Sequence, residues 1–274
     1  MTLVGGRERK TSENDEIVDR SRRALAEVLK ETALRCGGQV REEDGLLLAA
    51  ANHPCPVLVN SALRLGAMDA EEVLSRSRKF FGELGHGWET WIRHGADADL
   101  ERAAREHEMQ LAPELVGMVA EFCPDLPEPR PGVELRKVTD SQGVRAFREV
   151  AADGFREEAP GLSDLIHALF SEERMLIAPD TAALVVHYWG MPAATAMMML
   201  KEGIAWIGWV ATRPYSRRLG LGQLATAAAT RAGFELGAKF ASLEATEMGV
   251  PVYLRLGYRE IARYRNYWPK GFGT

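Results

Sequence analysis

The stretch Arg217-Arg218-Leu219-Gly220-Leu221-Gly222 lies between a strand-like run, residues 204–212, and an apolar helical pattern that begins at Gln223. Gly220 and Gly222 lack a Cβ atom, so the backbone can adopt unusual dihedral angles and bring its N–H groups close to anionic oxygens. The helix adds the positive end of its dipole, about half an elementary charge, and the two arginines add mobile cations. The stretch therefore predicts a site for an anion with several oxygens, such as a pyrophosphate.

Two kinds of cofactor site use a loop of this type. Read as G-x-G-x-x-A, Gly220, Gly222 and Ala225 match a dinucleotide fingerprint, and Glu244 lies roughly 20 residues downstream, where the ribose-binding acid belongs. In dinucleotide folds, however, the glycines follow the strand almost at once, whereas residues 213–219 intervene here. Too little chain also remains after Glu244 to complete a wound sheet. A dinucleotide-binding oxidoreductase stays an alternative that requires nicotinamide binding.

The arrangement resembles motif A of the GNAT superfamily of acyl-CoA N-acyltransferases, whose R/Q-x-x-G-x-G/A loop is matched by Arg217, Gly220 and Gly222. In that family the loop holds the pyrophosphate of coenzyme A. Downstream, the segment Val252-Tyr253-Leu254-Arg255-Leu256-Gly257-Tyr258 resembles the L-Y-x-x-L-G-F segment of motif B. The resemblance covers about residues 133–268. It implies an α/β GNAT fold, with a mixed, mostly antiparallel sheet flanked by helices.

The resemblance also implies which residues form the site. In the family, two neighbouring strands splay apart, the pantetheine arm lies in the gap, and a backbone N–H near Val210 donates to the oxyanion. The tyrosine that matches Tyr253 often protonates the departing thiolate, to which an unperturbed phenol pKa of about 10 is suited. Thr246 and Gly249 stand where the family usually has Asn and Ala. The acetyl-CoA-binding residues carried over are Val210, Ala211, Thr212, Arg217, Arg218, Leu219, Gly220, Leu221, Gly222, Gln223, Thr246 and Gly249.

No general base is evident. Many relatives place a glutamate on the strand before motif A, but Trp206-Ile207-Gly208-Trp209 contains no carboxylate. Glu244 or Glu247, or water held by backbone carbonyls, could take the proton, although both glutamates are also typical of strand ends and caps. Tyr253 is likewise compatible with a half-buried core aromatic. The two tryptophans could line a pocket for the acceptor amine, but strand aromatics are more often simply packed.

Composition narrows the function further. The 274 residues carry a net charge of −5, which argues against a nucleic-acid partner and is compatible with a cationic amine. Cys36, Cys55 and Cys123 are scattered, so we expect neither a disulfide framework nor a metal site, and a cytoplasmic location fits. No apolar run is long enough for a membrane span, so no membrane partner is expected.

A linker with four prolines, residues 124–131, divides the chain. We expect a flexible tail at 1–15, an α/β N-terminal domain at 16–123 and the GNAT domain at 132–274. In the latter, the pattern predicts the order strand, helix, helix, three strands, helix, strand, helix and strand. Asp140 or Ser141 is expected to cap its first helix.

The N-terminal half shows a similar succession of patterns. Apolar periodicity predicts a first helix, two buried strands, a helix, a strand, a helix and a final extended segment. The predicted bounds are 17–34, 45–51, 56–62, 70–84, 88–93, 99–107 and 109–119. This order favours a degenerate second GNAT half, with an unrelated small domain as the alternative. Residues 64–69 have one glycine and place Asp69 where a phosphate would lie, so this half is not expected to bind coenzyme A.

The favoured function is an acetyl-CoA-dependent N-acetyltransferase that transfers an acetyl group directly, in a ternary complex, to a primary amine. The acceptor is a small molecule or a protein amine, either an N-terminus or a lysine, and the sequence does not identify it. A coenzyme A-binding sensor or structural relative without catalysis is the second hypothesis, because no base is evident and half of the chain looks degenerate. A homodimer would be compatible with either hypothesis.

Overall fold

The computed structural model describes residues 4–55, 59–156 and 162–271. Its helices are α1 (Val4–Arg35), α2 (Ala70–Leu84), α3 (Ala98–Glu106), α4 (Ser141–Phe155), α5 (Leu162–Leu169), α6 (Leu221–Glu235) and α7 (Val250–Arg255). Strands of the first half are β1 (Gln39–Glu43), β2 (Leu46–Ala50), β3 (Ser61–Arg64), β4 (Glu89–Trp91), β5 (Gln110–Leu111) and β6 (Leu115–Ala120). Those of the second half are β7 (Val133–Lys137), β8 (Thr181–Tyr188), β9 (Met191–Lys201), β10 (Ile204–Thr212), β11 (Phe240–Thr246), β12 (Arg259–Tyr264) and β13 (Tyr267–Trp268).

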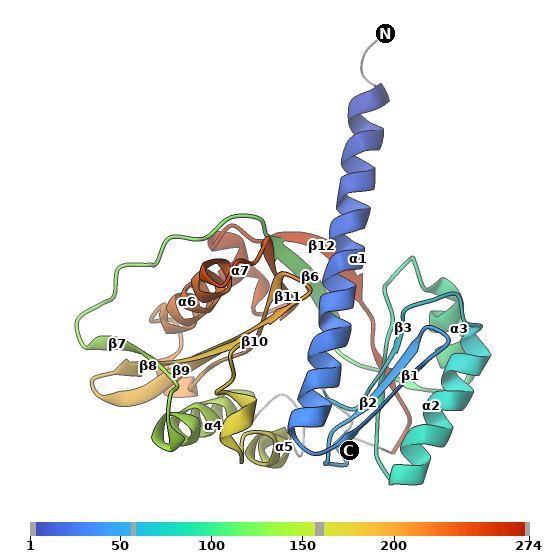
Figure 1. Ribbon diagram of the computed structural model, residues 1–274, viewed down its shortest axis with the longest axis horizontal. Helices are drawn as coiled ribbons and strands as arrows, with labels where there is room; N and C mark the ends of the chain where they lie inside the picture. Colours follow the sequence, from blue (N-terminus) through green and yellow to red (C-terminus); the bar gives the residue numbers. More distant parts are fainter. Residues whose placement is uncertain (1–3, 56–58, 157–161, 272–274) are drawn as a thin grey trace.

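Two separate sheets form the framework (Figure 1). One has the order β1-β2-β3-β4-β13-β5 and the other β12-β6-β11-β10-β9-β8-β7. Most neighbouring strands are antiparallel, and each sheet contains one parallel pair, β3–β4 or β10–β11. The chain joins each pair through a 15-residue helix, α2 or α6. The two halves therefore share one strand-helix-strand order, which confirms the expected α/β fold with a repeated first half.

The halves exchange strands, which the sequence patterns did not indicate. Strand β6 comes from the first half but lies between β11 and β12, antiparallel to both. Strand β13 comes from the end of the chain but lies between β4 and β5 of the first sheet. The prediction of one extended segment over 109–119 was wrong, because β5 and β6 belong to different sheets. The linker at 124–131 therefore divides the sequence into two segments, but each sheet contains strands from both segments.

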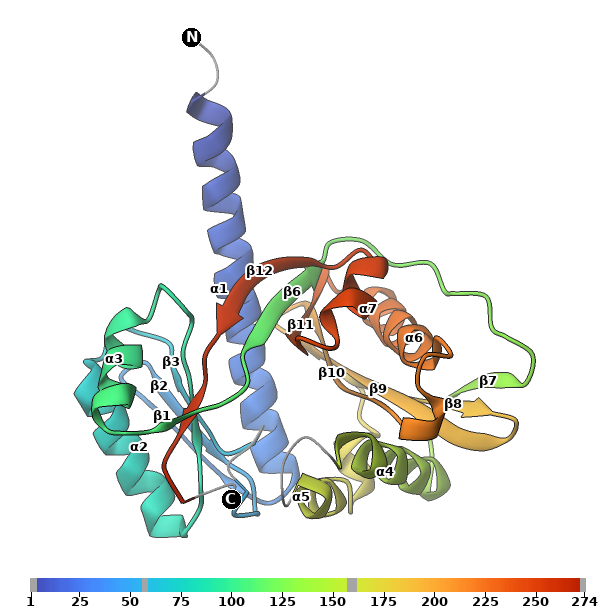
Figure 2. The same cartoon turned by 180° about the vertical axis from the view of Figure 1, so that it is seen from behind.

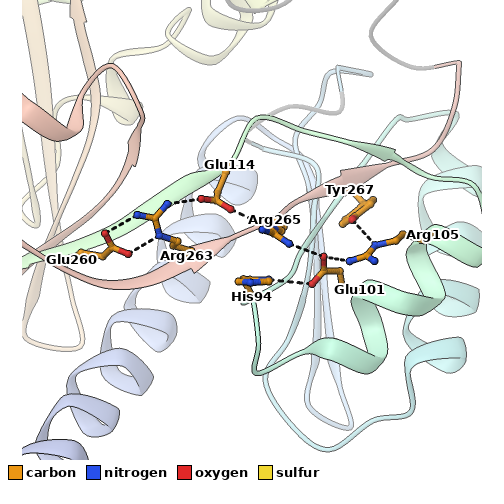
Figure 3. Close-up of polar contacts among 8 residues, drawn as sticks. All are labelled: His94, Glu101, Arg105, Glu114, Glu260, Arg263, Arg265 and Tyr267. Atoms are coloured by element: carbon orange, nitrogen blue, oxygen red, sulfur yellow. Dashed lines mark hydrogen bonds and ion pairs between the residues drawn. The ribbon is translucent and has the colours of Figure 1, made fainter.

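Two segments join the exchanged strands: the one between β5 and β6 and the one between β12 and β13. They run side by side between the sheets (Figure 2). Figure 3 shows the polar contacts that join them. The Glu114 carboxylate accepts from Arg263 Nη1 at 2.7 Å and from Arg265 Nε at 3.0 Å. Arg265 also reaches Glu101 at the first turn of α3, at 3.3 Å. The two arginines lower the pKa of Glu114, so the pairing holds over the neutral pH range.

Helix α1 lies between the two sheets and packs against both (Figure 1). Its Leu25 and Leu29 belong to the core of the first half, whereas Val28 belongs to a core of the second. The helix begins at Val4, so the part of the expected flexible tail that the structure describes is helical. No proline interrupts residues 4–35, and the helical pattern therefore continues N-terminally beyond the expected start at residue 17.

Most remaining element boundaries agree with the predictions, including α2 at 70–84 and the cap of α4. The Asp140 Oδ1 atom accepts from the Gly143 backbone N–H at 2.8 Å. Strand β3 begins later than expected, at residue 61, and residues 56–58 lie outside the described part. The Asn60 side chain accepts from Ala51 N and donates to His53 O and Cys55 O, which ties the residue before β3 to the end of β2 and to residues 53–55. In the described ranges, no helix combines the length and apolar character needed to cross a membrane.

The exchange predicts that the second half does not fold alone. A fragment of residues 132–274 lacks β6, so β11 and β12 lose the strand between them and expose two unpaired edges. We expect this fragment to aggregate, and co-expression with residues 1–131 to restore one folded complex. Size-exclusion chromatography and circular dichroism measure both outcomes. A cooperative unfolding transition in the isolated fragment would contradict the prediction.

Candidate functional site

The loop before α6 forms an open anion cradle. Arg218 and Gly220 have positive φ angles of 63° and 79°, which turns the chain sharply into the helix. Within the described part of the chain no side-chain cap hydrogen bond is present at the helix N-terminus, Gly220, so the first backbone N–H groups are left for another acceptor. A Cβ atom at Gly222 would lie 2.9 Å from Thr212 Oγ1, so a larger residue would close the cradle against the end of β10.

The two loop arginines differ in role. Arg217 donates from Nη2 to Gly154 O at 3.1 Å and from Nε to Thr212 O at 3.4 Å. It therefore ties the loop to α4 and β10, which corrects the expectation that it is a mobile cation. Arg218 is exposed, and within the described residues it has no ion-pair partner. This second arginine can move toward an anion bound at the loop.

The equivalent loop of the first half is closed. Asp69 caps α2, and its Oδ1 atom accepts from Glu71 N at 2.9 Å and Glu72 N at 3.4 Å. Leu65 and Gly66 donate their backbone N–H groups to Gly45 O. A protein carboxylate thus occupies the place that a phosphate would take, as the sequence predicted.

The strands beside the loop splay apart. Strands β10 and β11 pair only from Ile204 to Trp206, and beyond that point a gap opens between them. Strand β10 also bulges away from β9, because Trp209 and Val210 have no partner in the register. Trp209 has a φ of 52°, and its carbonyl accepts from Thr195 Oγ1 at 3.1 Å. The bulge leaves the backbone at Val210 beside the gap without a strand partner.

One cavity of about 650 Å³ joins these features. All the residues predicted for cofactor binding or catalysis line it except Leu219, which packs against a hydrophobic core instead. Glu247 is exposed and is not part of the lining. The lining residues from the predicted set are Val210, Ala211, Thr212, Arg217, Arg218, Gly220, Leu221, Gly222, Gln223, Glu244, Thr246, Gly249 and Tyr253.

Glu244 lies on the cavity wall between the Trp206 and Tyr264 rings. A glycine beside each ring leaves space for it. The Trp206 indole covers Gly208, where a Cβ atom would lie 1.9 Å from the ring, and its Nε1 donates to Glu244 Oε2 at 2.8 Å. On the other side, Gly117 of β6 pairs with Glu244, and a Cβ there would lie 3.0 Å from the Tyr264 ring. Burial raises the pKa of Glu244 to about 7, and the Trp206 hydrogen bond opposes part of that rise.

Tyr253 faces the same cavity from α7. It is 9% exposed, and Gly249 lies under its ring, where a Cβ atom would be 2.9 Å away. The neighbouring Tyr258 ring is 6.0 Å from it, but the hydroxyl of Tyr258 is bonded to Thr230 Oγ1 at 2.6 Å. Of these two tyrosines, only Tyr253 lines the cavity.

The cavity also has lining residues that the sequence patterns did not indicate. The first half supplies Leu25, Val28, Leu29 and Thr32 of α1, together with Trp91 and Leu115. Phe155, at the end of α4, contributes as well, and residues 157–161 lie outside the described part. Arg130 of the linker, Met248 and Arg255 complete the wall. No local signal could have found the residues of α1, β4 and β6, because packing between the halves brings them here.

No cluster of three or more His, Cys, Asp or Glu side chains with the geometry of a metal site occurs in the described ranges.

Comparison with known proteins gives structural relatives only. No protein-family model matches the chain, and no curated protein matches its sequence. A GCN5-related N-acetyltransferase from Kribbella flavida aligns with a TM-score of 0.70 and 23% identity, over 90% of this chain and 96% of that one. A functionally unknown protein from Staphylococcus epidermidis gives 0.66 and 16%, over 86% and 95% of the two chains. A tandem GNAT protein from the clavulanic acid biosynthesis pathway gives 0.56 and 12%, over 81% and 77%. The chain therefore has the GNAT fold, in a tandem form with exchanged strands.

Proposed function

We propose that this protein is an acetyl-CoA-dependent N-acetyltransferase that transfers the acetyl group directly to a primary amine. The observation that carries the proposal is a single cavity that joins an uncapped helix N-terminus, a splayed strand, a tyrosine and a carboxylate. The GNAT fold of the structural relatives supports it. Acetyl-CoA supplies the activated acyl group, and the protein supplies orientation and proton transfer.

The residues present fit such a cosubstrate. The N–H groups at the start of α6, with Gly220 and Gly222 beside them, would hold the pyrophosphate, and Arg218 would add a mobile cation. The unpaired backbone at Val210 would donate to the thioester oxygen and stabilise its developing charge. Holding the two reactants together in a shaped cavity can contribute on the order of 7 to 11 kcal/mol.

Two side chains would move protons. Glu244, whose raised pKa of about 7 lies near neutral pH, would as a carboxylate accept the proton that the amine loses as its nitrogen forms the new C–N bond. Tyr253 would donate a proton to the sulfur as the C–S bond breaks. The elevated pKa of Glu244 favours an active enzyme over the sensor hypothesis, because a carboxylate poised near the working pH suits a base.

Gly222→Glu should abolish acetyl-CoA binding. The new side chain would clash with Thr212 Oγ1 and place a negative charge in the anion cradle. Calorimetric titration should show binding by the parent protein and none by this variant. Gly82→Glu is the matched control, because Gly82 is exposed on α2 of the first half with open space around it. NADH should bind to none of the three proteins. A parent protein that does not bind acetyl-CoA would overturn the proposed function.

Glu244→Gln should lower kcat roughly 100-fold, within the usual contribution of a general base, and leave acetyl-CoA affinity unchanged. The kcat of the parent should rise with pH through about 7 and then level off, because only the carboxylate accepts a proton. The variant should lose this rise. Glu247→Gln is the control, since Glu247 is exposed and outside the cavity, and it should behave as the parent. Equal loss in both variants would exclude Glu244 as the base.

Glu244→Gln should also change how the stability of the fold depends on pH. The pKa of Glu244 is about 7 in the folded protein and near 4.5 when unfolded, so its ionisation destabilises the fold as pH rises from about 4.5 past 7. Glu244→Gln removes this cost. Its Tm relative to the parent should therefore be higher at pH 8 than at pH 5, as measured by differential scanning calorimetry. A pH-independent difference in Tm would show that the pKa is not raised.

Tyr253→Phe should lower kcat by roughly 10²-fold, the lower end for a positioned acid, with little change in KM. Tyr258→Phe is the matched control. It also removes a tyrosine hydroxyl, but one outside the cavity lining that is bonded to Thr230, so it should cost about 1 kcal/mol of stability and retain kcat. Steady-state kinetics and urea unfolding separate the two effects. A Tyr253→Phe enzyme with parental kcat would remove Tyr253 from the mechanism.

A further inference from the structure

The end of the cavity beyond Glu244 is built largely by the first half of the chain. Leu25, Val28 and Leu29 lie on one face of α1, which runs between the two sheets (Figure 1). Trp91 of β4 and Leu115 of β6 complete this wall. We call these five residues the apolar wall. The side chains of α1 and Trp91 are at most 4% exposed, so the wall is part of the packed interior and has a defined shape.

Polar groups are sparse at this end. Thr32 contributes a hydroxyl one turn beyond Val28, and the Trp206 indole N–H is already bonded to Glu244. Glu244 is the single carboxylate among the described lining residues. The described lining also includes four arginines: Arg217 and Arg218 of the loop at the start of α6, Arg130 of the linker and Arg255 of α7. The described lining therefore offers an apolar surface around one acid, with no partner for a second positive charge.

We propose that the acceptor is a primary amine carried on an uncharged hydrocarbon or aryl body. This inference rests on the proposed function and adds the substrate class to it. The amine would lie at Glu244 and the body against the apolar wall. A hydrocarbon gains about fourfold in affinity for each methylene group removed from water. A second ammonium on the body would instead lose its hydration without gaining a partner. Polyamines are therefore disfavoured.

The test compares amines of matched length with the full-length protein and acetyl-CoA. From n-butylamine to n-hexylamine, kcat/KM should rise roughly 15-fold, since two methylene groups are added. The distally charged analogue 1,4-diaminobutane should react at least about 100-fold less well than n-pentylamine. Equal or faster turnover of this analogue would overturn the substrate class while leaving acetyl transfer intact. A parent protein without acetyl-CoA binding would overturn both proposals together.

A charge placed in the apolar wall should invert this preference. Val28→Asp supplies a carboxylate for the distal ammonium, so kcat/KM for 1,4-diaminobutane relative to n-pentylamine should rise at least about tenfold. Val28 is buried, and Thr32→Asp offers a second position that is already polar if the first variant does not fold. Leu34→Asp is the control, because Leu34 is 56% exposed on the same helix and outside the lining. Acetyl-CoA affinity should stay at the parental value in each folded variant.

Two results would overturn the inference at this step. One is an unchanged amine preference in both cavity variants while Leu34→Asp also behaves as the parent. The other is the same shift in the Leu34→Asp control, which would trace the effect to net charge rather than to the wall. Calorimetric binding of acetyl-CoA, measured on the same preparations, keeps failure of the cosubstrate site distinct from failure of the acceptor assignment.

Discussion

The exchange of β6 and β13 is the constraint on which the rest of the structure depends. Each sheet is completed by a strand from the other half, so neither can satisfy its backbone hydrogen bonds alone. The exchange also builds the site. Strand β6 runs beside β11, and its Gly117 leaves space for the Tyr264 ring next to Glu244. The environment that raises the pKa of this carboxylate thus exists only when both halves are folded together.

The two halves share one topology but differ at the loop that precedes the helix. In each, a strand leads through a turn into a helix whose N-terminus attracts negative charge. In the first half Asp69 supplies that charge from within the chain, which stabilises α2 and closes the position. In the second half Gly220 leaves it open to the cavity. The first half also contributes α1 and its apolar residues to the cavity of the second.

The places of the glycine loop and of Tyr253 on the cavity wall could be predicted because they depend on neighbours in sequence: glycines before a helix, and a tyrosine at a fixed place on a short helix. Glu244 could be named but not assigned a role. Its pKa depends on burial and on the Trp206 indole, which Gly208 admits, and these come from different strands. Arg217 is the opposite case. The loop pattern predicted a mobile cation, but in the structure this side chain donates to Gly154 O and holds the loop against α4.

By itself, the sequence determined the elements and the site loop: α2, the order of strands and helices in the second half, the acid at Asp69 and the open glycines before α6. These follow from periodicity, caps and turns, which act over a few residues. Only the tertiary structure decided which sheet each strand joins and what lines the far end of the cavity. Strands that lie more than a hundred residues apart in the sequence, such as β6 and β12, pair because of how the completed sheets and α1 pack together. A short apolar strand such as β6 has no local sequence feature that identifies its partner.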